Sequence, residues 1–218
     1  MARCPFASQV AISGGAGPYT AGPFRIVHHT TEGSTARGAF DTYRARRVDP
    51  HFTVDHLGIY QHIDTAFAAR ALRNERAQPL ETNLLSAVQI EVVGFAHLPK
   101  QGATLHNVAR LCRWIEATHD VARRWPNGLP KPAVDGRDPG RHNRDPDTWR
   151  TESGHYGHCH VPENIHWDPA YTESEVLFLM EGPGPAALRA LRASRRREAV
   201  PEPTARQLRQ AGSTMSGH

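Results

Sequence analysis

The chain has 218 residues, 39% of them hydrophobic, which is enough for one domain with a sizeable core. No apolar run approaches the roughly 20 residues of a membrane-spanning helix, and residues 1–9 lack the apolar segment of a secretory signal. The net charge of +4 is concentrated in residues 182–218, which hold seven arginines and two glutamates. Three widely separated cysteines exclude a disulfide framework and a zinc ribbon, and favour free thiols.

The first predicted element is a strand over residues 24–29. Residues 1–23 before it are rich in small residues, glycine and proline, and we expect an irregular lead-in that packs over the domain. Residues 24–29 are β-branched and aromatic enough for a strand, which ends at the pair His28 and His29. Side chains alternate along a strand, so these two histidines face opposite sides and only one can readily reach a given metal ion.

The middle of the chain alternates between helical and extended patterns. Residues 33–46 begin with candidate N-cap residues and predict a helix, residues 51–63 predict two short strands, and residues 64–72 predict a short helix. Residues 85–93 form an apolar strand with a single charge, Glu91. A carboxylate is costly to bury unless it is paired or has a chemical role, and the spacing alone leaves both readings open.

Two further helices follow, separated by a long segment. Apolar residues at helical spacing over residues 103–119 predict an amphipathic helix packed on the sheet. Residues 126–150 are rich in proline, glycine, aspartate and arginine and predict a long ordered loop. Residues 171–181 predict a final helix, whose inward-facing residues are expected to be Val176, Leu177 and Met180.

A glycine- and proline-rich stretch after this helix predicts a domain boundary. It separates a main domain over residues 24–181 from a basic, flexible tail over residues 182–218. A basic tail favours anionic partners such as wall polymers, membrane surfaces or nucleic acid.

Residues 153–169 carry the densest group of metal-ligand side chains in the chain. Histidine accounts for 14 of the 218 residues, and four of them lie in this segment together with Asp168. Imidazole nitrogen and carboxylate oxygen are the usual ligands of a catalytic zinc ion. One segment rarely supplies a whole site, so we expect a further ligand from the pair His28 and His29. The four histidines of the segment are His155, His158, His160 and His166.

Four motifs follow one another along the chain. They are Ile26-Val27-His28-His29-Thr30-Thr31, the pair His51–Val54 and Ile59–His62, Asn83–Glu91 with its Asn-x-x-Ser-x-x-x-Ile-Glu pattern, and Gly157-His158-Cys159-His160-Val161-Pro162 followed by His166-Trp167-Asp168-Pro169. In this order they resemble the motifs of the zinc-dependent N-acetylmuramoyl-L-alanine amidases of amidase type 2. This family is related to the peptidoglycan recognition proteins, and the resemblance covers roughly residues 24–180.

The resemblance implies an α/β fold with a single mixed central β-sheet flanked by helices. It implies a Zn²⁺ site formed by His28, as the first histidine of its motif, together with His158 and Asp168. Glu91 would be the catalytic carboxylate, and His166, where many members carry lysine, would stabilise the oxyanion. The implied reaction is hydrolysis of the amide bond between N-acetylmuramic acid and L-alanine.

That reaction makes peptidoglycan or a muropeptide the expected substrate. Without a secretory signal, we expect a protein made in the cytoplasm that acts on the cell wall, as a phage endolysin or an exported effector does. A non-catalytic peptidoglycan-binding module of the same fold is the main alternative.

Three alternatives concern the metal ligand and the class of protein. Within the histidine cluster, His155 and His160 compete with His158 as metal ligand. A nucleic-acid-binding protein is disfavoured because the positive charge is confined to the tail. A different zinc hydrolase, such as a peptidase, lacks support because the chain has no His-Glu-x-x-His motif.

Overall fold

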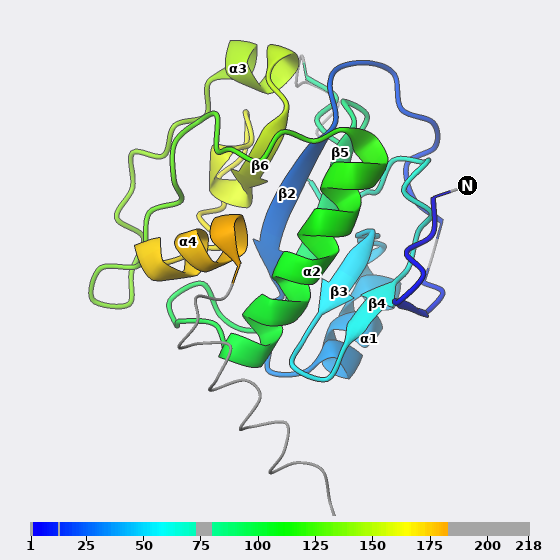
Figure 1. Cartoon of the computed structure of the whole chain (residues 1–218), viewed down its shortest axis with the longest axis horizontal. Coiled ribbons are helices and arrows are strands. Elements are labelled where there is room, and N and C mark those ends of the chain that lie inside the picture. The colour runs from blue at the N-terminus through cyan, green and yellow to red at the C-terminus, as the bar shows by residue number, and fades with distance from the viewer. Residues whose placement is uncertain (1, 13, 73–79, 183–218) are drawn as a thin grey trace, which may run out of the picture. The chain divides into compact units, whose positions relative to one another are not determined.

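One mixed sheet of six strands forms the centre of the fold (Figure 1). The structure, a computed structural model, describes residues 2–12, 14–72 and 80–182. The strand order is β1-β4-β3-β5-β2-β6; β3 and β4 pair antiparallel, and the other neighbours pair in parallel. The strands are β1 (Ser8–Gln9), β2 (Arg25–Thr30), β3 (Phe52–Val54), β4 (Ile59–Gln61), β5 (Ala87–Val92) and β6 (Gly154–Gly157).

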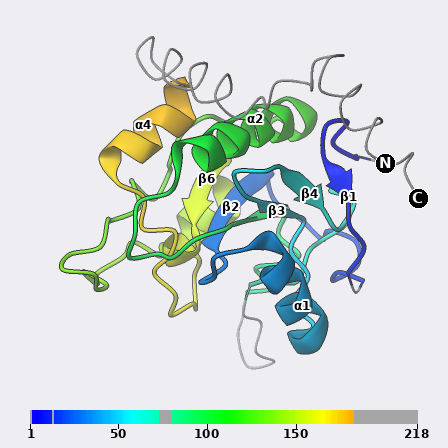
Figure 2. The same cartoon turned by 90° about the horizontal axis from the view of Figure 1, so that it is seen from below.

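Helices cover both faces of this sheet, as the predicted fold class requires. Figure 2 shows α2 and α4 on one face and α1 on the other. Among the residues described, no helix is long and apolar enough to cross a membrane. The predicted tail, residues 182–218, lies outside the described part of the chain except for Gly182. The helices are α1 (Ala36–Arg46), α2 (Gly102–His119), α3 (Pro146–Thr151), α4 (Glu173–Glu181) and the short 3₁₀ helix η1 (His158–His160).

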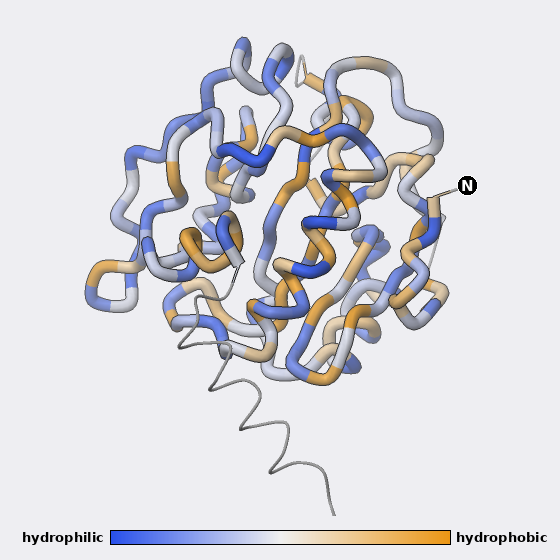
Figure 3. Tube along the Cα trace, viewed as in Figure 1, coloured by the Kyte–Doolittle hydropathy of each residue, from blue (hydrophilic) through white to orange (hydrophobic). Residues whose placement is uncertain are grey.

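Helices α1 and α2 begin and pack close to where the sequence pattern predicts. Thr35 caps α1, because its hydroxyl accepts a hydrogen bond from the backbone N–H of Gly38 at 3.1 Å. Apolar and polar residues alternate along α2 in the colouring of Figure 3, and its apolar side packs on the sheet. The α2 residues at helical spacing that are fully buried there are Val108, Leu111, Cys112 and Ile115.

The two central strands, β2 and β5, are buried along their whole length. Parallel strands in the middle of a sheet are covered on both faces, which explains this burial. Val88, Ile90 and Val92 of β5 belong to the core beneath α2, so Gln89 and Glu91 face the opposite side of the sheet. This alternation decides which polar side chains of the two strands can meet.

Residues 64–72 do not form the predicted helix. Their backbone N–H groups bond to distant segments instead: Ala68 donates to Gly17 and Arg70 donates to Asp49, both at 2.8 Å. The Asp64 carboxylate accepts from the N–H of Ala66 at 3.0 Å and closes a turn at the start of the segment. Extended pairing across the fold therefore replaces the local helix.

Four other elements differ from the prediction. Strand β1 lies within residues 1–23, which were expected to be irregular. The expected loop contains α3, which Asp145 caps by accepting from the N–H of Thr148 at 2.6 Å. A Pro at the first helical position was the available signal for this helix. Strand β6 was not predicted. In α4, Val176 and Leu179 are buried, whereas Leu177 points outward with 49% of its surface exposed.

Candidate metal centre

His29, His158 and Asp168 come together at the carboxyl end of β2, and each is buried. One ligand atom from each lies within 4.8 Å of the others. The Nδ1 atoms of His29 and His158 are 3.0 Å apart, and Nδ1 of His158 is 3.3 Å from Oδ1 of Asp168. These are the separations that one small ion can bridge.

The charge states of these groups suit a metal ion. Burial, together with the adjacent His158, lowers the pKa of His29 well below its ordinary value, so its imidazole is neutral and offers a lone pair. Burial opposes ionisation of Asp168, but His158, His29 and the N–H of Thr30 hold the pKa of Asp168 well below its ordinary value. Two imidazoles and one carboxylate form a donor set typical of catalytic zinc.

Orphaned atoms in the same group support this fit. The Nε2 atoms of both His29 and His158 are buried and have no hydrogen-bond partner among the described residues. Imidazoles held in a core by hydrogen bonds alone would normally use both ring nitrogens. Hydrogen bonds alone therefore do not account for the placement of these two rings, and their facing Nδ1 atoms with the Asp168 carboxylate fit a bound Zn²⁺ ion.

Backbone contacts hold the loop between the two later ligands. The N–H of Thr30 donates to Oδ2 of Asp168 at 2.9 Å, and the N–H of Cys159 donates to the Asp168 carbonyl, also at 2.9 Å. Strand β6 pairs with β2 so that Gly157 lies beside His28, and η1 then begins with His158. The nonlocal pairing of β6 therefore delivers His158 to the end of β2.

Gly157 allows the tight packing at the start of η1. A β-carbon there would lie 2.8 Å from both Sγ of Cys159 and Cδ of Pro169. We expect Gly157→Ala to displace the loop, lowering zinc affinity and costing about 1–3 kcal/mol of unfolding free energy. Zinc titration and thermal melting test this. Gly102→Ala is the matched control, because its β-carbon would meet no atom within 4 Å; equal behaviour of the two variants would contradict the prediction.

Glu91 lies on the same side of the sheet as His29, because β2 and β5 pair His29 with Glu91 in parallel register. It is buried, and among the described residues it makes no hydrogen bond or ion pair. Burial, and secondarily the negative charges of Asp168 and Glu32, raise the pKa of Glu91 well above its ordinary value. A desolvated carboxylate with a raised pKa is suited to accept and return a proton.

His166 stacks on His158, with ring centroids 4.3 Å apart and ring planes 10° from parallel. Its Nδ1 is 4.0 Å from Oδ1 of Asp168, and its side chain is half exposed. Both His166 and Glu91 line the same pocket of about 410 Å³ as the three candidate ligands. The pocket is otherwise lined by Thr30, Thr31, Glu32, Thr42, Tyr43, Arg46, Val48, Arg70, Ala71 and Leu72.

The structure corrects the choice between the two histidines of β2. The predicted ligand His28 lies on the other face of the strand, fully buried, where it contacts Tyr171 and His155. The alternation of the two side chains was predicted correctly, but the side was not. In β5 the apolar residues alternate with Gln89 and Glu91, and the register between β2 and β5 places His29 on the polar face that carries Glu91.

The competing histidines of the cluster lie elsewhere. His155 hydrogen-bonds to His28 on the far face of β2, and His160 accepts from the N–H of Gly157 at 3.1 Å through Nδ1. Of the predicted site residues, His158, Asp168, Glu91 and His166 are therefore brought together, and His28 is not.

The fold and this group of side chains are those of a candidate metal-dependent hydrolase. The family model of the N-acetylmuramoyl-L-alanine amidases, Amidase_2, matches residues 20–171. Because this region is most of the chain, the protein belongs to that family. A comparison with the sequences of curated proteins finds no match.

Solved structures share the fold. The Staphylococcus aureus hydrolase AmiA, solved in complex with its ligand, aligns with a TM-score of 0.56 at 14% identity over 83% of each chain. The endolysin N-acetylmuramoyl-L-alanine amidase LysCS from Clostridium intestinale aligns with a TM-score of 0.50 at 14% identity, over 81% of this chain and 96% of its own. At this identity the likeness shows the fold alone.

Proposed function

We propose that the protein is a zinc-dependent amidase that hydrolyses the bond between N-acetylmuramic acid and L-alanine in the peptidoglycan of a cell wall. Membership of the amidase family supports the reaction class. The observation that carries the proposal is the convergence of His29, His158 and Asp168 with Glu91 in one pocket. Zn²⁺ bound there would lower the pKa of a water molecule and polarise the scissile carbonyl.

Two side chains beside the three candidate ligands transfer the proton and stabilise the developing negative charge. Glu91, with its raised pKa and no described partner, takes a proton from the attacking water and returns it to the leaving amine of L-alanine. His166, half exposed at the mouth of the group, donates a hydrogen bond to the carbonyl oxygen as negative charge develops on it. The stacking of His166 on His158 holds its ring in the pocket.

Two arginines make the pocket suitable for an acidic substrate. Arg46 and Arg70 both line it, and Arg70 is held by an ion pair with Asp49 at 2.6 Å. Peptidoglycan stem peptides carry carboxylate groups, which guanidinium groups bind well. We assign these arginines to the peptide side of the scissile bond. The basic tail, as a second contact with anionic wall polymers, remains a prediction from the sequence.

Removal and return of the metal test the proposal directly. We expect the purified protein to release peptides with a free L-alanine amino terminus from peptidoglycan. Activity should disappear after chelation and return with added Zn²⁺. Mass spectrometry of the products identifies the cleaved bond. Binding of peptidoglycan without release of peptide, despite stoichiometric zinc, would support a recognition module and overturn the enzymatic proposal.

A further inference from the structure

A second group of metal-ligand side chains lies on the face of β2 opposite to His29. It consists of His28 of β2, Cys112 of α2 and His155 of β6, all fully buried. One ligand atom from each lies within 4.8 Å of the others. The proposed amidase reaction uses none of these three residues, so their gathering in the core needs its own explanation.

The inner nitrogens of the two histidines face each other, and their outer nitrogens are anchored. Nε2 of His28 is 3.0 Å from Nδ1 of His155. On the outer side, Nδ1 of His28 is 3.3 Å from the Tyr171 hydroxyl, and Nε2 of His155 is 3.0 Å from Oε1 of Glu116. Histidines that bind metals usually have their second nitrogen held by a carboxylate or another polar group in this way.

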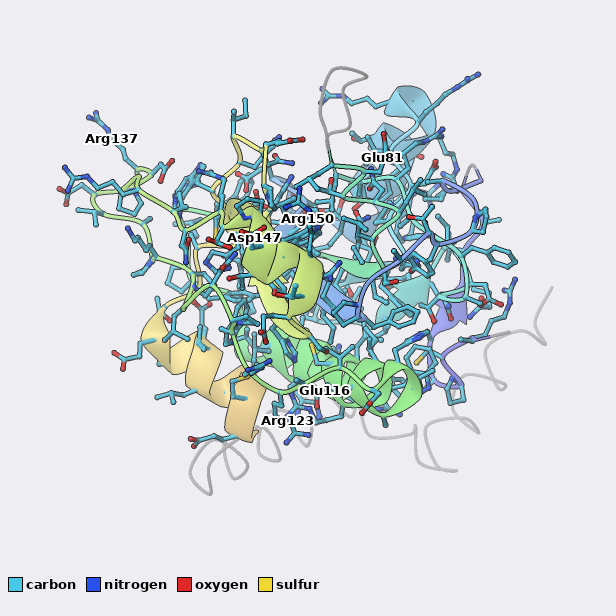
Figure 4. All side chains as sticks on the ribbon, turned by 90° about the horizontal axis from the view of Figure 1, so that it is seen from above. Glu81, Glu116, Arg123, Arg137, Asp147 and Arg150 are labelled. Carbon is cyan, nitrogen blue, oxygen red and sulfur yellow. The ribbon has the colours of Figure 1, made fainter. Side chains whose placement is uncertain are left out.

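Glu116 is itself fixed, so it can orient His155. Its Oε1 accepts from Arg113 at 2.5 Å and its Oε2 accepts from Arg123 at 2.9 Å. Figure 4 shows Glu116 on α2 with Arg123 beside it. A chain of contacts therefore runs from the Glu116 carboxylate through the His155 ring to Nδ1 of His155 in the buried group. The negative charge of Glu116 partly offsets the positive charge of a bound cation.

Cys112 supplies the third donor. Burial raises the pKa of the Cys112 thiol, so without a cation it is protonated. A coordinated ion displaces that proton and binds the thiolate, the form of cysteine that acts as a ligand. A thiolate with two imidazoles selects thiophilic ions such as Zn²⁺ over Mg²⁺ or Ca²⁺.

The amidase centre provides an internal comparison. Both groups have two histidine nitrogens 3.0 Å apart and a third donor within the same 4.8 Å limit. In a tetrahedral zinc site with Zn–N bonds of about 2.0–2.1 Å, two ligand nitrogens are about 3.3 Å apart. In either group, the two histidine rings need to move apart by only a few tenths of an ångström to bind a zinc ion in this geometry.

We propose that His28, Cys112 and His155 form a second metal site, which binds a thiophilic ion such as Zn²⁺ in a structural role. The ion ties β2 and β6 to α2 inside the core. Because the three ligands come from elements far apart in the sequence, binding is coupled to folding. The site goes beyond the proposed amidase function and does not depend on it.

Metal content of matched variants tests the proposal. The full chain is prepared from cells supplied with Zn²⁺ and dialysed, and zinc per chain is measured by elemental analysis. We expect two equivalents in the unaltered protein and in Cys159→Ala, whose cysteine is equally buried but belongs to neither group. We expect one equivalent in His158→Ala and one in Cys112→Ala.

Cobalt provides a readout that only the second site can give. After exchange with Co²⁺, a thiolate-to-cobalt charge-transfer band is expected in the unaltered protein and in His158→Ala, and is expected to be lost in Cys112→Ala. If Cys112→Ala fails to fold, the band in His158→Ala still decides the question. A single equivalent that disappears in His158→Ala, with no thiolate band, would overturn the proposal and leave a hydrogen-bonded chain from Tyr171 to Glu116.

The same measurements separate this inference from the proposed function. One equivalent that survives in His158→Ala and disappears in Cys112→Ala would support the second site and contradict the amidase centre. Absence of peptide release from a protein that binds two equivalents of zinc would contradict the proposed reaction but still support the second metal site.

Discussion

Replacing His29 with alanine is expected to abolish peptide release, a loss of at least about a hundredfold, and to remove one equivalent of zinc. Loss of a buried ligand leaves His158 and Asp168 as an incomplete donor set, and even the partners that orient metal ligands are worth about 10- to 100-fold. Peptide release measured against zinc content checks this result. His97→Ala, which alters an exposed histidine, is the control.

The variant His28→Ala, at the position next to His29, tests which of the two histidines the activity requires. His28→Ala removes the buried partner of the Tyr171 hydroxyl and of Nδ1 of His155, so we expect a loss of about 1–3 kcal/mol in unfolding free energy. Its folded fraction should still release peptide, because His28 lies on the other face of β2. Full activity of His29→Ala alongside an inactive but folded His28→Ala would reverse the assignment.

Glu91→Gln is expected to lower kcat by about 10²- to 10⁴-fold, the usual contribution of a general base, while zinc content and KM change little. The amide is nearly isosteric with the carboxylate but does not accept the proton of the attacking water. Steady-state kinetics on a soluble muropeptide, with metal analysis of the same sample, checks the prediction. Retention of kcat would remove Glu91 from the proposed mechanism.

The same variant has a readout that does not depend on activity. The pKa of Glu91 in the folded protein lies above its unfolded value, so the folded state binds more protons. Stability of the metal-free protein therefore falls as the pH rises through the unfolded pKa towards the folded one. Glu91→Gln should melt at a higher temperature than the unaltered metal-free protein at pH 7. An unchanged or lower melting temperature would show that burial of the Glu91 carboxylate does not destabilise the metal-free protein at pH 7.

Local patterns in the sequence were sufficient to predict most elements of the fold. The strand ending at the histidine pair, the two strands within residues 51–63 and the helix near residues 103–119 all appear where periodicity places them. Strand β6 could not be found in this way. Its sequence, Gly-His-Tyr-Gly, has little intrinsic strand preference, and the pairing with β2 that defines it joins residues far apart in the chain.

The candidate site shows the same division between local and nonlocal information. The spacing and family resemblance of the histidine cluster led to His158, His166 and Asp168, which the structure gathers in one pocket. For His28 and His29, alternation predicts two opposite faces but not which of them carries the site. The answer depends on the register between β2 and β5, which pairs His29 with Glu91 and is a property of the folded sheet.

The N-terminal segment has a consequence for self-association. Strand β1 pairs with β4 at the margin of the sheet, and the N–H of Val10 continues this contact by donating to the carbonyl of Gln61 at 2.9 Å. A chain that began at residue 24 would leave the backbone groups of β4 unpaired. Open strands of this kind recruit strands of other molecules, which leads to aggregation. The segment before β2 therefore shields the sheet from edge-to-edge association as well as completing it.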